Sequence, residues 1–235
     1  EEPAEDPAEE PAEDELVRPL AIAWYGTPPG IDGDVAGGLA QAAAVNTCEP
    51  LVEYEPRMNE QGFYEMFVAA SEPDEFVPRL AESFEVSEDG TTWTFNLRQG
   101  VKSNYGNELT AADVKWSYER AFGAGGVGGW IVKNALRLAG PESVKVIDDY
   151  TIEFELIGYN PIFLNCLRIY TPCIHDSTEL KKHVTDAYPW GLEWTAVNNA
   201  TSGPWQLEEL DPGVQAVFTP NPNYYRGQPY FSQII

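Results

Sequence analysis

Three segments of this sequence alternate apolar and polar residues on both sides of a tight turn, and no other feature constrains the fold as strongly. Residues 84–97 turn at Asp89-Gly90, residues 144–156 at Asp148-Asp149, and residues 205–218 at Asp211-Pro212-Gly213. Successive side chains on a strand point to opposite faces, so each segment predicts a β-hairpin with one buried face.

Helical patterns lie between and ahead of these hairpins. Thr110 and Asp113 have the spacing of a capping box, with Asp113 in place of the usual glutamate, and helical periodicity follows. We therefore expect an amphipathic helix over residues 111–122. Alanine-rich residues 39–48 predict a second helix, and the apolar run over residues 20–25 predicts a buried strand. Together these elements predict a mixed α+β or α/β fold class with several short sheets.

The sequence is strongly acidic. Its formal net charge is −24, and removing the nine acids among the first fifteen residues still leaves −15 for residues 16–235. An acidic surface repels phosphate backbones and anionic lipid, so we expect no nucleic-acid partner and no docking on a lipid surface. The first fifteen residues repeat acids with Pro and Ala, which predicts a disordered acidic tether over residues 1–18.

The sequence contains three cysteines, Cys48, Cys166 and Cys173, and their positions alone do not determine whether a disulfide forms. No CxxC pair occurs, so a structural zinc site is not expected. Cys166 and Cys173 can pair across a short loop in an oxidising compartment, although the sequence is compatible with any of the three single pairings. The alternative is that all three are small buried hydrophobic residues.

Two motifs match known ligand-binding patterns, a nucleotide-binding loop and a metal site, but the surrounding sequence does not support either function. The segment 123–128 matches GxGxxG, but a capped helix precedes it instead of a strand, so we expect a flexible loop and not a nucleotide site. His175, Glu179 and His183 are spaced four residues apart and would share one helix face, which would suit a metal ion. A solvated helix is the simpler interpretation of this polar segment.

The sequence offers few residues for a catalytic triad, because it has two histidines, and it lacks the GxSxG motif of a nucleophile elbow. Aromatic residues are better candidates for ligand contact. Trp93 alternates with polar residues on a predicted strand and belongs in a core, whereas Trp130, Trp190 and Trp194 lie in loop-like stretches where they can stack on a ligand.

Six motifs follow one another along the chain. They are LAESFEVSEDG (80–90), WTFNLRQGVK (93–102), LTAADVKWSYERA (109–121), VKVIDDYTIEFEL (144–156), SGPWQL (202–207) and PNPNYYRG (220–227). In this order and spacing the chain resembles family 5 of the extracellular solute-binding proteins, the oligopeptide, dipeptide and nickel binders, from about Leu20 to Ile235. Residues 102–106 depart from the family's usual pattern, but in a surface turn.

The resemblance implies a two-lobed, periplasmic-binding-protein-like fold whose lobes close on a ligand. Residues 19–49 and 175–235 would form the core of the first lobe, and residues 50–174 an inserted α+β subdomain. Residues 231–235 look like the start of another strand, and the second lobe would follow Ile235.

The resemblance also implies a role in transport. The protein would be the substrate-binding component of an ABC importer, holding a small peptide between its lobes and delivering it to the permease subunits. The loop after Ile31-Asp32 meets ligand in the family, and here it contains Ala36, Gly37, Gly38 and Gln41. Glycines there leave backbone groups open to a peptide bound as an added strand. The alternative is that the two glycines only form the entrance to a helix.

No cofactor, metal or catalytic residue is expected. One alternative keeps the transport role with an oligosaccharide or a chelated metal as ligand, and a less favoured one is a secreted hydrolase with two converging carboxylates. The expected location is extracytoplasmic, as a periplasmic protein or a cell-surface lipoprotein made with a signal peptide and anchored through a lipidated cysteine upstream of Glu1.

Overall fold

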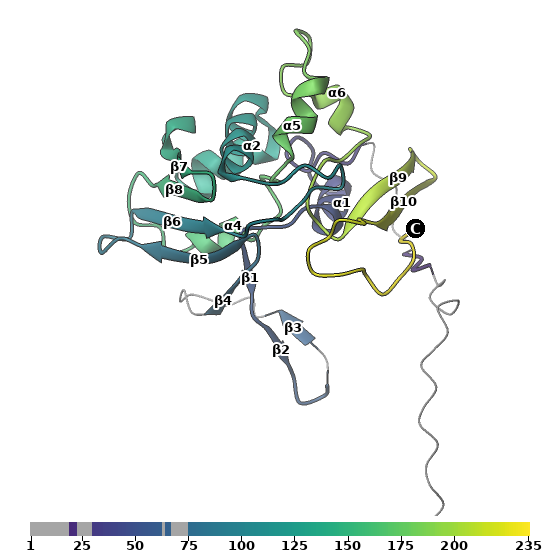
Figure 1. Cartoon of the computed structure of the whole chain (residues 1–235), viewed down its shortest axis with the longest axis horizontal. Helices are drawn as coiled ribbons and strands as arrows, with labels where there is room; N and C mark the ends of the chain where they lie inside the picture. The colour runs from purple at the N-terminus through teal and green to yellow at the C-terminus, as the bar shows by residue number, and fades with distance from the viewer. Residues whose placement is uncertain (1–18, 23–29, 63, 67–74) are drawn as a thin grey trace, which may run out of the picture.

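A four-stranded antiparallel sheet carries two of the three predicted hairpins (Figure 1). The computed structural model describes residues 19–22, 30–62, 64–66 and 75–235, so the predicted tether lies outside the described residues. The strands run in the order β5–β6–β8–β7. They are β5 (Ala81–Val86), β6 (Thr92–Leu97), β7 (Val144–Asp148) and β8 (Thr151–Glu155). β6 pairs with β8 so that Trp93 faces Phe154 and Phe95 faces Ile152, and all four side chains are buried as the alternation predicts.

Helix α2 (Ala111–Ala124) covers the apolar side of this sheet. Its start is fixed by Asp113, whose Oδ2 accepts hydrogen bonds from the Thr110 backbone N–H at 2.8 Å and from the Thr110 hydroxyl at 3.0 Å. Tyr118 then packs edge-on against Phe154, with ring centroids 5.0 Å apart. The predicted helix is confirmed, and it extends two residues beyond the predicted end at Phe122.

The glycine-rich segment after α2 is helical, so the prediction of a flexible loop is wrong. A short helix α3 (Gly126–Trp130) leads into a π-helical turn (Ile131–Ala135). The amide of Gly128 donates to the backbone oxygen of Asp34 at 2.7 Å, a contact with a distant segment that local sequence does not reveal.

Smaller elements surround the sheet. Two short antiparallel pairs join β1 (Val52–Tyr54) to β4 (Phe76–Pro78) and β2 (Pro56–Met58) to β3 (Tyr64–Met66). The remaining helices are the 3₁₀ turns Pro141–Ser143 and Lys181–His183, α4 (Phe163–Leu167), α5 (Ser177–Leu180) and α6 (Leu192–Thr195). Over the described ranges, every helix is too short or too polar to cross a membrane.

The third predicted hairpin is also confirmed. β9 (Trp205–Asp211) pairs with β10 (Gln215–Pro220) across a bulge at Val217/Phe218. Ile234 then bridges to Phe218 on one side and to Leu20 on the other. The buried strand predicted over residues 20–25 is not confirmed: Leu20 makes only an isolated bridge, Ile22 is exposed, and residues 23–25 lie outside the described residues.

Buried apolar residues form two main groups, and helix α1 (Leu39–Thr47) contributes to the smaller one. The larger core draws all its fully buried members from residues 51–174 and lies between the four-stranded sheet and α2. The smaller core joins the α1 region to the β9–β10 hairpin; its buried members are Ile31, Ala43, Trp205, Phe218 and Ile234.

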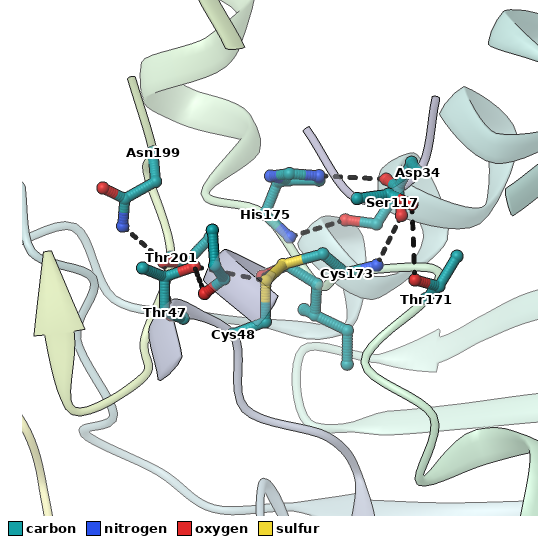
Figure 2. The surroundings of a disulfide bond; sticks show 12 residues. Asp34, Thr47, Cys48, Ser117, Thr171, Cys173, His175, Asn199 and Thr201 are labelled. Carbon is teal, nitrogen blue, oxygen red and sulfur yellow. Dashed lines mark hydrogen bonds and ion pairs between the residues drawn. A yellow bond between two sulfur atoms is a disulfide. The ribbon is translucent and has the colours of Figure 1, made fainter. Parts of the chain in front are cut away.

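A disulfide joins Cys48 to Cys173, 125 residues apart in sequence (Figure 2). Cys166 is buried and free. The suggested pairing of Cys166 with Cys173 is therefore wrong, because Cys166 packs into the larger core on α4. Cys48 follows α1 and Cys173 precedes the segment that returns to the smaller core. The disulfide therefore links the two points at which the chain passes between the smaller core and the larger core.

Loss of this disulfide should lower the free energy of unfolding, and only substitution of Cys48 or Cys173 should have this effect. In the chain-entropy model, a loop of this length contributes about 5 kcal/mol to the free energy of unfolding. We expect Cys48→Ser to unfold at much lower urea concentration than the wild type and to be insensitive to reductant. Cys166→Ala is the matched control. It should still lose stability on reduction, and insensitivity of that variant would contradict the pairing.

Candidate ligand-binding loop

The loop over residues 31–38 turns sharply before it enters α1. The backbone oxygen of Asp32 accepts from the N–H groups of Val35 at 3.3 Å and Ala36 at 3.1 Å, and the Asp32 side chain accepts from the Asp34 N–H at 3.1 Å. This turn sends both acidic side chains inward, and the backbone that follows it lies at the surface.

The two glycines that follow are exposed. Gly38 has φ of 66°, a conformation that side chains rarely adopt, and no atom lies within 4 Å of where its Cβ would be. Among the described residues, the amide nitrogens of Gly37 and Gly38 donate to no backbone or side-chain acceptor. Val127 of α3 lies beside them, 3.6 Å from a Cβ built on Gly37. The loop thus offers open backbone donors, with the partly buried Ala36 at its edge.

Unlike the two glycines, Gln41 forms hydrogen bonds that point into the protein. Its Nε2 donates to the backbone oxygen of Gly33 at 2.8 Å and to Oγ1 of Thr171 at 2.7 Å. The side chain therefore ties the loop to the segment before Cys173, and its amide nitrogen faces inward.

A buried arginine on α2 holds the loop from beneath. Arg120 is fully buried, and its guanidinium pairs with the carboxylates of both Asp32 and Asp34, the latter at 2.8 Å. It also donates to Thr195 Oγ1 at 3.0 Å and to the Trp190 backbone oxygen at 3.1 Å. One side chain thus connects α2, the loop and the α6 region.

Asp34 connects the loop to the segment that contains Cys173 and His175 (Figure 2). Besides Arg120, it accepts from the Cys173 backbone N–H at 2.8 Å, and its Oδ2 lies 3.1 Å from His175 Nε2. The backbone of His175 is fixed in turn, since its main-chain N–H donates to Ser117 Oγ at 2.9 Å. The disulfide, the loop and α2 therefore meet at one carboxylate.

Electrostatics keep Asp32 ionised. Burial alone would raise the pKa of its carboxyl group, but the charge and hydrogen bonds of the Arg120 guanidinium outweigh burial, and the pKa lies below its usual value. Burial opposes the charge on Arg120 as well, yet its two acidic neighbours raise its pKa further. Asp32 and Arg120 are therefore both charged at neutral pH.

The glycines of the GxGxxG segment allow α3 to approach this loop. A Cβ on Gly126 would lie 2.7 Å from the Val35 backbone oxygen, and Gly126 itself has φ of 63°. A Cβ on Gly128 would lie 3.3 Å from Asp34. The motif therefore serves close packing of backbone on backbone.

Asp32, Asp34 and His175 bring three potential metal-ligating atoms within 4.8 Å of one another. Arg120 already pairs with both carboxylates, and its permanent positive charge would repel a cation. These residues do not fit a metal ion.

The suggested set of His175, Glu179 and His183 does not come together. His175 precedes α5 and bonds to Asp34, whereas Glu179 Oε1 lies 3.0 Å from His183 Nε2 within the surface turn. The solvated-helix interpretation is wrong for α5, because Ser177, Glu179 and Leu180 are buried. The exposed lysines follow it, in the 3₁₀ turn Lys181–His183.

The three candidate tryptophans have separate environments. Trp190 packs on Trp116 with ring centroids 6.1 Å apart, and Trp194 stacks on His183 at 4.2 Å. Trp130, at the end of α3, is 60% exposed and stays available to a ligand. Trp93 is buried in the larger core, as predicted.

Sequence reasoning missed Arg120 and its two acidic partners. Arg120 lies off the apolar stripe formed by Val114, Tyr118 and Ala121, where an exposed arginine is the normal expectation. Only the approach of the distant loop buries it.

The family model described as bacterial extracellular solute-binding proteins, family 5 (middle), matches residues 75–235, well over half of the chain. The chain belongs to this family. That confirms the resemblance, and it places this family-5 chain outside the cytoplasm, as expected.

Curated relatives and solved structures agree with this assignment. The probable D,D-dipeptide-binding periplasmic protein DdpA of Escherichia coli (strain K12) is 32% identical over 155 residues, covering 66% of this chain and 28% of that protein. The dipeptide-binding protein of the same organism is 31% identical over 179 residues, covering 68% of this chain and 32% of that protein. The family-5 chain thus spans about a third of the length of these relatives.

The periplasmic binding protein DppA of Helicobacter pylori, solved in complex with the peptide STSA, superposes with a TM-score of 0.73 and 23% identity. The superposition covers 94% of this chain and 43% of that one. The expected periplasmic-binding-protein fold is therefore confirmed, with this chain forming part of it.

Removing the Arg120 charge should destabilise the protein strongly. Arg120→Met leaves two buried carboxylates without a counter-charge, a change that costs about 3–5 kcal/mol in comparable cases. Equilibrium urea unfolding measures the loss. Lys145→Met is the matched control, because Lys145 pairs with Glu153 and Glu155 at the surface, and its stability should stay close to that of the wild type.

The contribution of Asp32 should depend on pH. Because its pKa is lowered in the folded state, Asp32 stabilises the fold above its unfolded pKa of about 3.9, and this contribution is lost as pH falls through the lower folded value. The stability difference between wild type and Asp32→Asn should therefore be largest near neutral pH and shrink in acid. Unfolding curves across this range test it, and a difference that is constant with pH would contradict it.

Proposed function

We propose that this family-5 chain is part of the substrate-binding component of an ABC importer and binds peptides between two lobes. The observation that carries the proposal is the exposed backbone at Gly37 and Gly38, held on a rigid turn beside α3. A peptide bound in extended form needs such backbone partners, because its main-chain groups are common to all sequences.

The relatives support a peptide as the ligand. Two curated relatives are named for dipeptides, and the Helicobacter pylori structure contains a peptide. In this proposal Ala36, Gly37 and Gly38 face the peptide, Gln41 keeps the loop in position, and Trp130 offers an exposed ring nearby. Binding requires no cofactor and no chemical step, which fits a family of binding proteins.

The proposed domain division is 19–49 with 175–235 as the core of one lobe and 50–174 as an inserted subdomain. The separation of the two apolar cores supports it, since the buried members of the larger core fall within residues 51–174. The disulfide lies at both proposed boundaries.

The remaining parts of the proposal concern partners. The ligand-loaded protein would dock on permease subunits, and the acidic segment over residues 1–18 would act as a tether to a lipid anchor upstream of Glu1. Recovery of the protein from detergent extracts with an N-terminal diacylglyceryl group, detected by mass spectrometry, would support the anchor.

Ligand class can be tested by thermal unfolding of the full protein, because a ligand that binds only the folded state raises the midpoint temperature. We expect pools of di- to pentapeptides to raise it and oligosaccharides and Ni²⁺ to leave it unchanged. A shift with sugars or metal alone would keep the transport role and reject peptides. No shift with any of the three would reject the proposed ligand site.

A side chain on the loop should block peptide binding without unfolding the protein. Gly37→Leu places a bulky group over the exposed backbone, and we expect at least about a tenfold weaker peptide Kd by calorimetry, equivalent to about 1.4 kcal/mol. Gly158→Leu is the control, since its Cβ would also meet only an ordinary contact, 3.8 Å from Arg137. Equal weakening by both variants would contradict a site at the loop.

A further inference from the structure

The proposed peptide site combines two segments whose apolar residues lie in different cores. Ile31, at the start of the loop, is buried in the smaller core. Val127 of α3, which lies 3.6 Å from a Cβ built on Gly37, packs against the larger core. The geometry of the site therefore depends on how the chain is held where it passes between the two cores.

The segment at residues 171–173 contacts the loop directly (Figure 2). The main-chain N–H of Cys173 donates to Asp34 Oδ1 at 2.8 Å. The hydroxyl of Thr171 accepts from Gln41 Nε2 at 2.7 Å and donates to the Gly33 backbone oxygen at 3.5 Å. Thr171 and Cys173 are both buried, so water does not compete for these contacts. The position of the loop is thus coupled to the position of residues 171–173.

The disulfide closes residues 34–48 into a ring. The ring runs along the chain from Asp34 through α1 to Cys48, crosses the disulfide to Cys173, and returns to Asp34 through the Cys173 N–H. Gly37 and Gly38 lie within it. A glycine backbone has more accessible conformations than any other residue, so closure of the ring removes conformational freedom mainly at these two positions.

The Cys48 side of the ring is anchored independently. The backbone oxygen of Thr47 accepts from Thr201 Oγ1 at 2.6 Å and from the Gly203 N–H at 3.0 Å. A Cβ on Gly203 would lie 2.2 Å from that oxygen, so the two backbones are in close contact. The end of α1 is therefore a fixed point, and the disulfide links it covalently to residues 171–173.

We propose that the Cys48–Cys173 disulfide is a redox-dependent positioning element of the peptide site. A dithiol reduces it by transferring two electrons and two protons, which leaves two cysteine thiols and the dithiol as its own disulfide. Reduction opens the ring, and the loop then occupies its binding geometry for only part of the time, which weakens the apparent affinity. The disulfide itself does not touch the peptide. This inference rests on the proposed function.

Peptide affinity in the two redox states tests the proposal. The probe is a peptide selected from the di- to pentapeptide pools by its thermal shift, and calorimetry measures its Kd for the full protein before and after reduction with dithiothreitol. Titration of thiols shows that the bond is broken. We expect a Kd at least about fivefold weaker after reduction, which corresponds to a binding geometry populated about one fifth of the time, and recovery on reoxidation. Equal affinity in both states would overturn the proposal.

Two controls separate positioning from stability. Cys166→Ala removes the free thiol and should respond to reduction as the wild type does. Ile152→Ala lowers stability by opening a cavity in the middle of the four-stranded sheet, opposite Phe95, but should keep the wild-type Kd. A similar loss of affinity in oxidised Ile152→Ala would show that stability alone explains the effect and would contradict a positioning role.

Hydrogen exchange gives a measurement that needs no peptide. The amide of Gly128 donates to the Asp34 backbone oxygen from α3, so its exchange reports whether the loop is held. We expect this amide to exchange faster after reduction, while amides between β6 and β8 stay protected. Unchanged exchange at Gly128 would overturn the proposal. An oxidised protein that binds none of the peptide pools would reject the proposed function instead, and exchange would still decide the positioning role.

A variant that keeps the disulfide covers the case in which the reduced protein unfolds. Thr171→Val removes the hydroxyl between Gln41 and Gly33, and we expect it to weaken peptide binding about threefold, within the range of one neutral hydrogen bond. Thr171→Ser keeps a hydroxyl and should restore the wild-type Kd. Wild-type affinity in Thr171→Val would contradict transmission through residues 171–173.

Discussion

The buried guanidinium of Arg120 is the interaction on which the rest of the structure depends. It takes the carboxylates of Asp32 and Asp34 into the interior and so decides which way the loop before α1 turns. A charge in this environment is tolerated only when its partners are complete, and here carboxylates, a hydroxyl and a backbone oxygen supply them. Because the acids point inward, the backbone of the next residues is left at the surface, where the proposed peptide contact lies.

The loop is also held from its other sides. Gly128 donates to Asp34 from α3, and Gln41 binds the Gly33 backbone oxygen from α1. A binding surface that is fixed before the ligand arrives loses little conformational entropy on binding. The glycines have two different roles here. Gly126 and Gly128 allow α3 to pack closely against the backbone of the loop, whereas the space beside Gly38 is open.

Local patterns predicted the elements whose causes are local. The three hairpins and the capped helix follow from alternation, turns and the Thr110–Asp113 spacing. Burial repeats the alternation on β6 and β8, whereas Val86, Val146 and Val214, which belong to the predicted buried faces, are exposed. The family resemblance predicted the overall fold. The misses all depend on contacts between distant segments. Cys48 finds Cys173 across 125 residues, Arg120 is buried only by the arrival of the loop, and the glycine-rich segment is helical because it packs on Val35. Single-sequence periodicity contains no information about such contacts.

The position of the disulfide has a consequence for how an exported chain reaches its oxidised state. Cys48 emerges first and has no partner until another 125 residues have followed, and Cys166 emerges seven residues ahead of Cys173. An oxidant acting early therefore meets the wrong pair, Cys48 with Cys166. Packing of Cys166 into the larger core withdraws that thiol from exchange, since a buried thiol with a raised pKa reacts slowly. Once the larger core is formed, Cys173 is therefore the accessible partner that is left for Cys48.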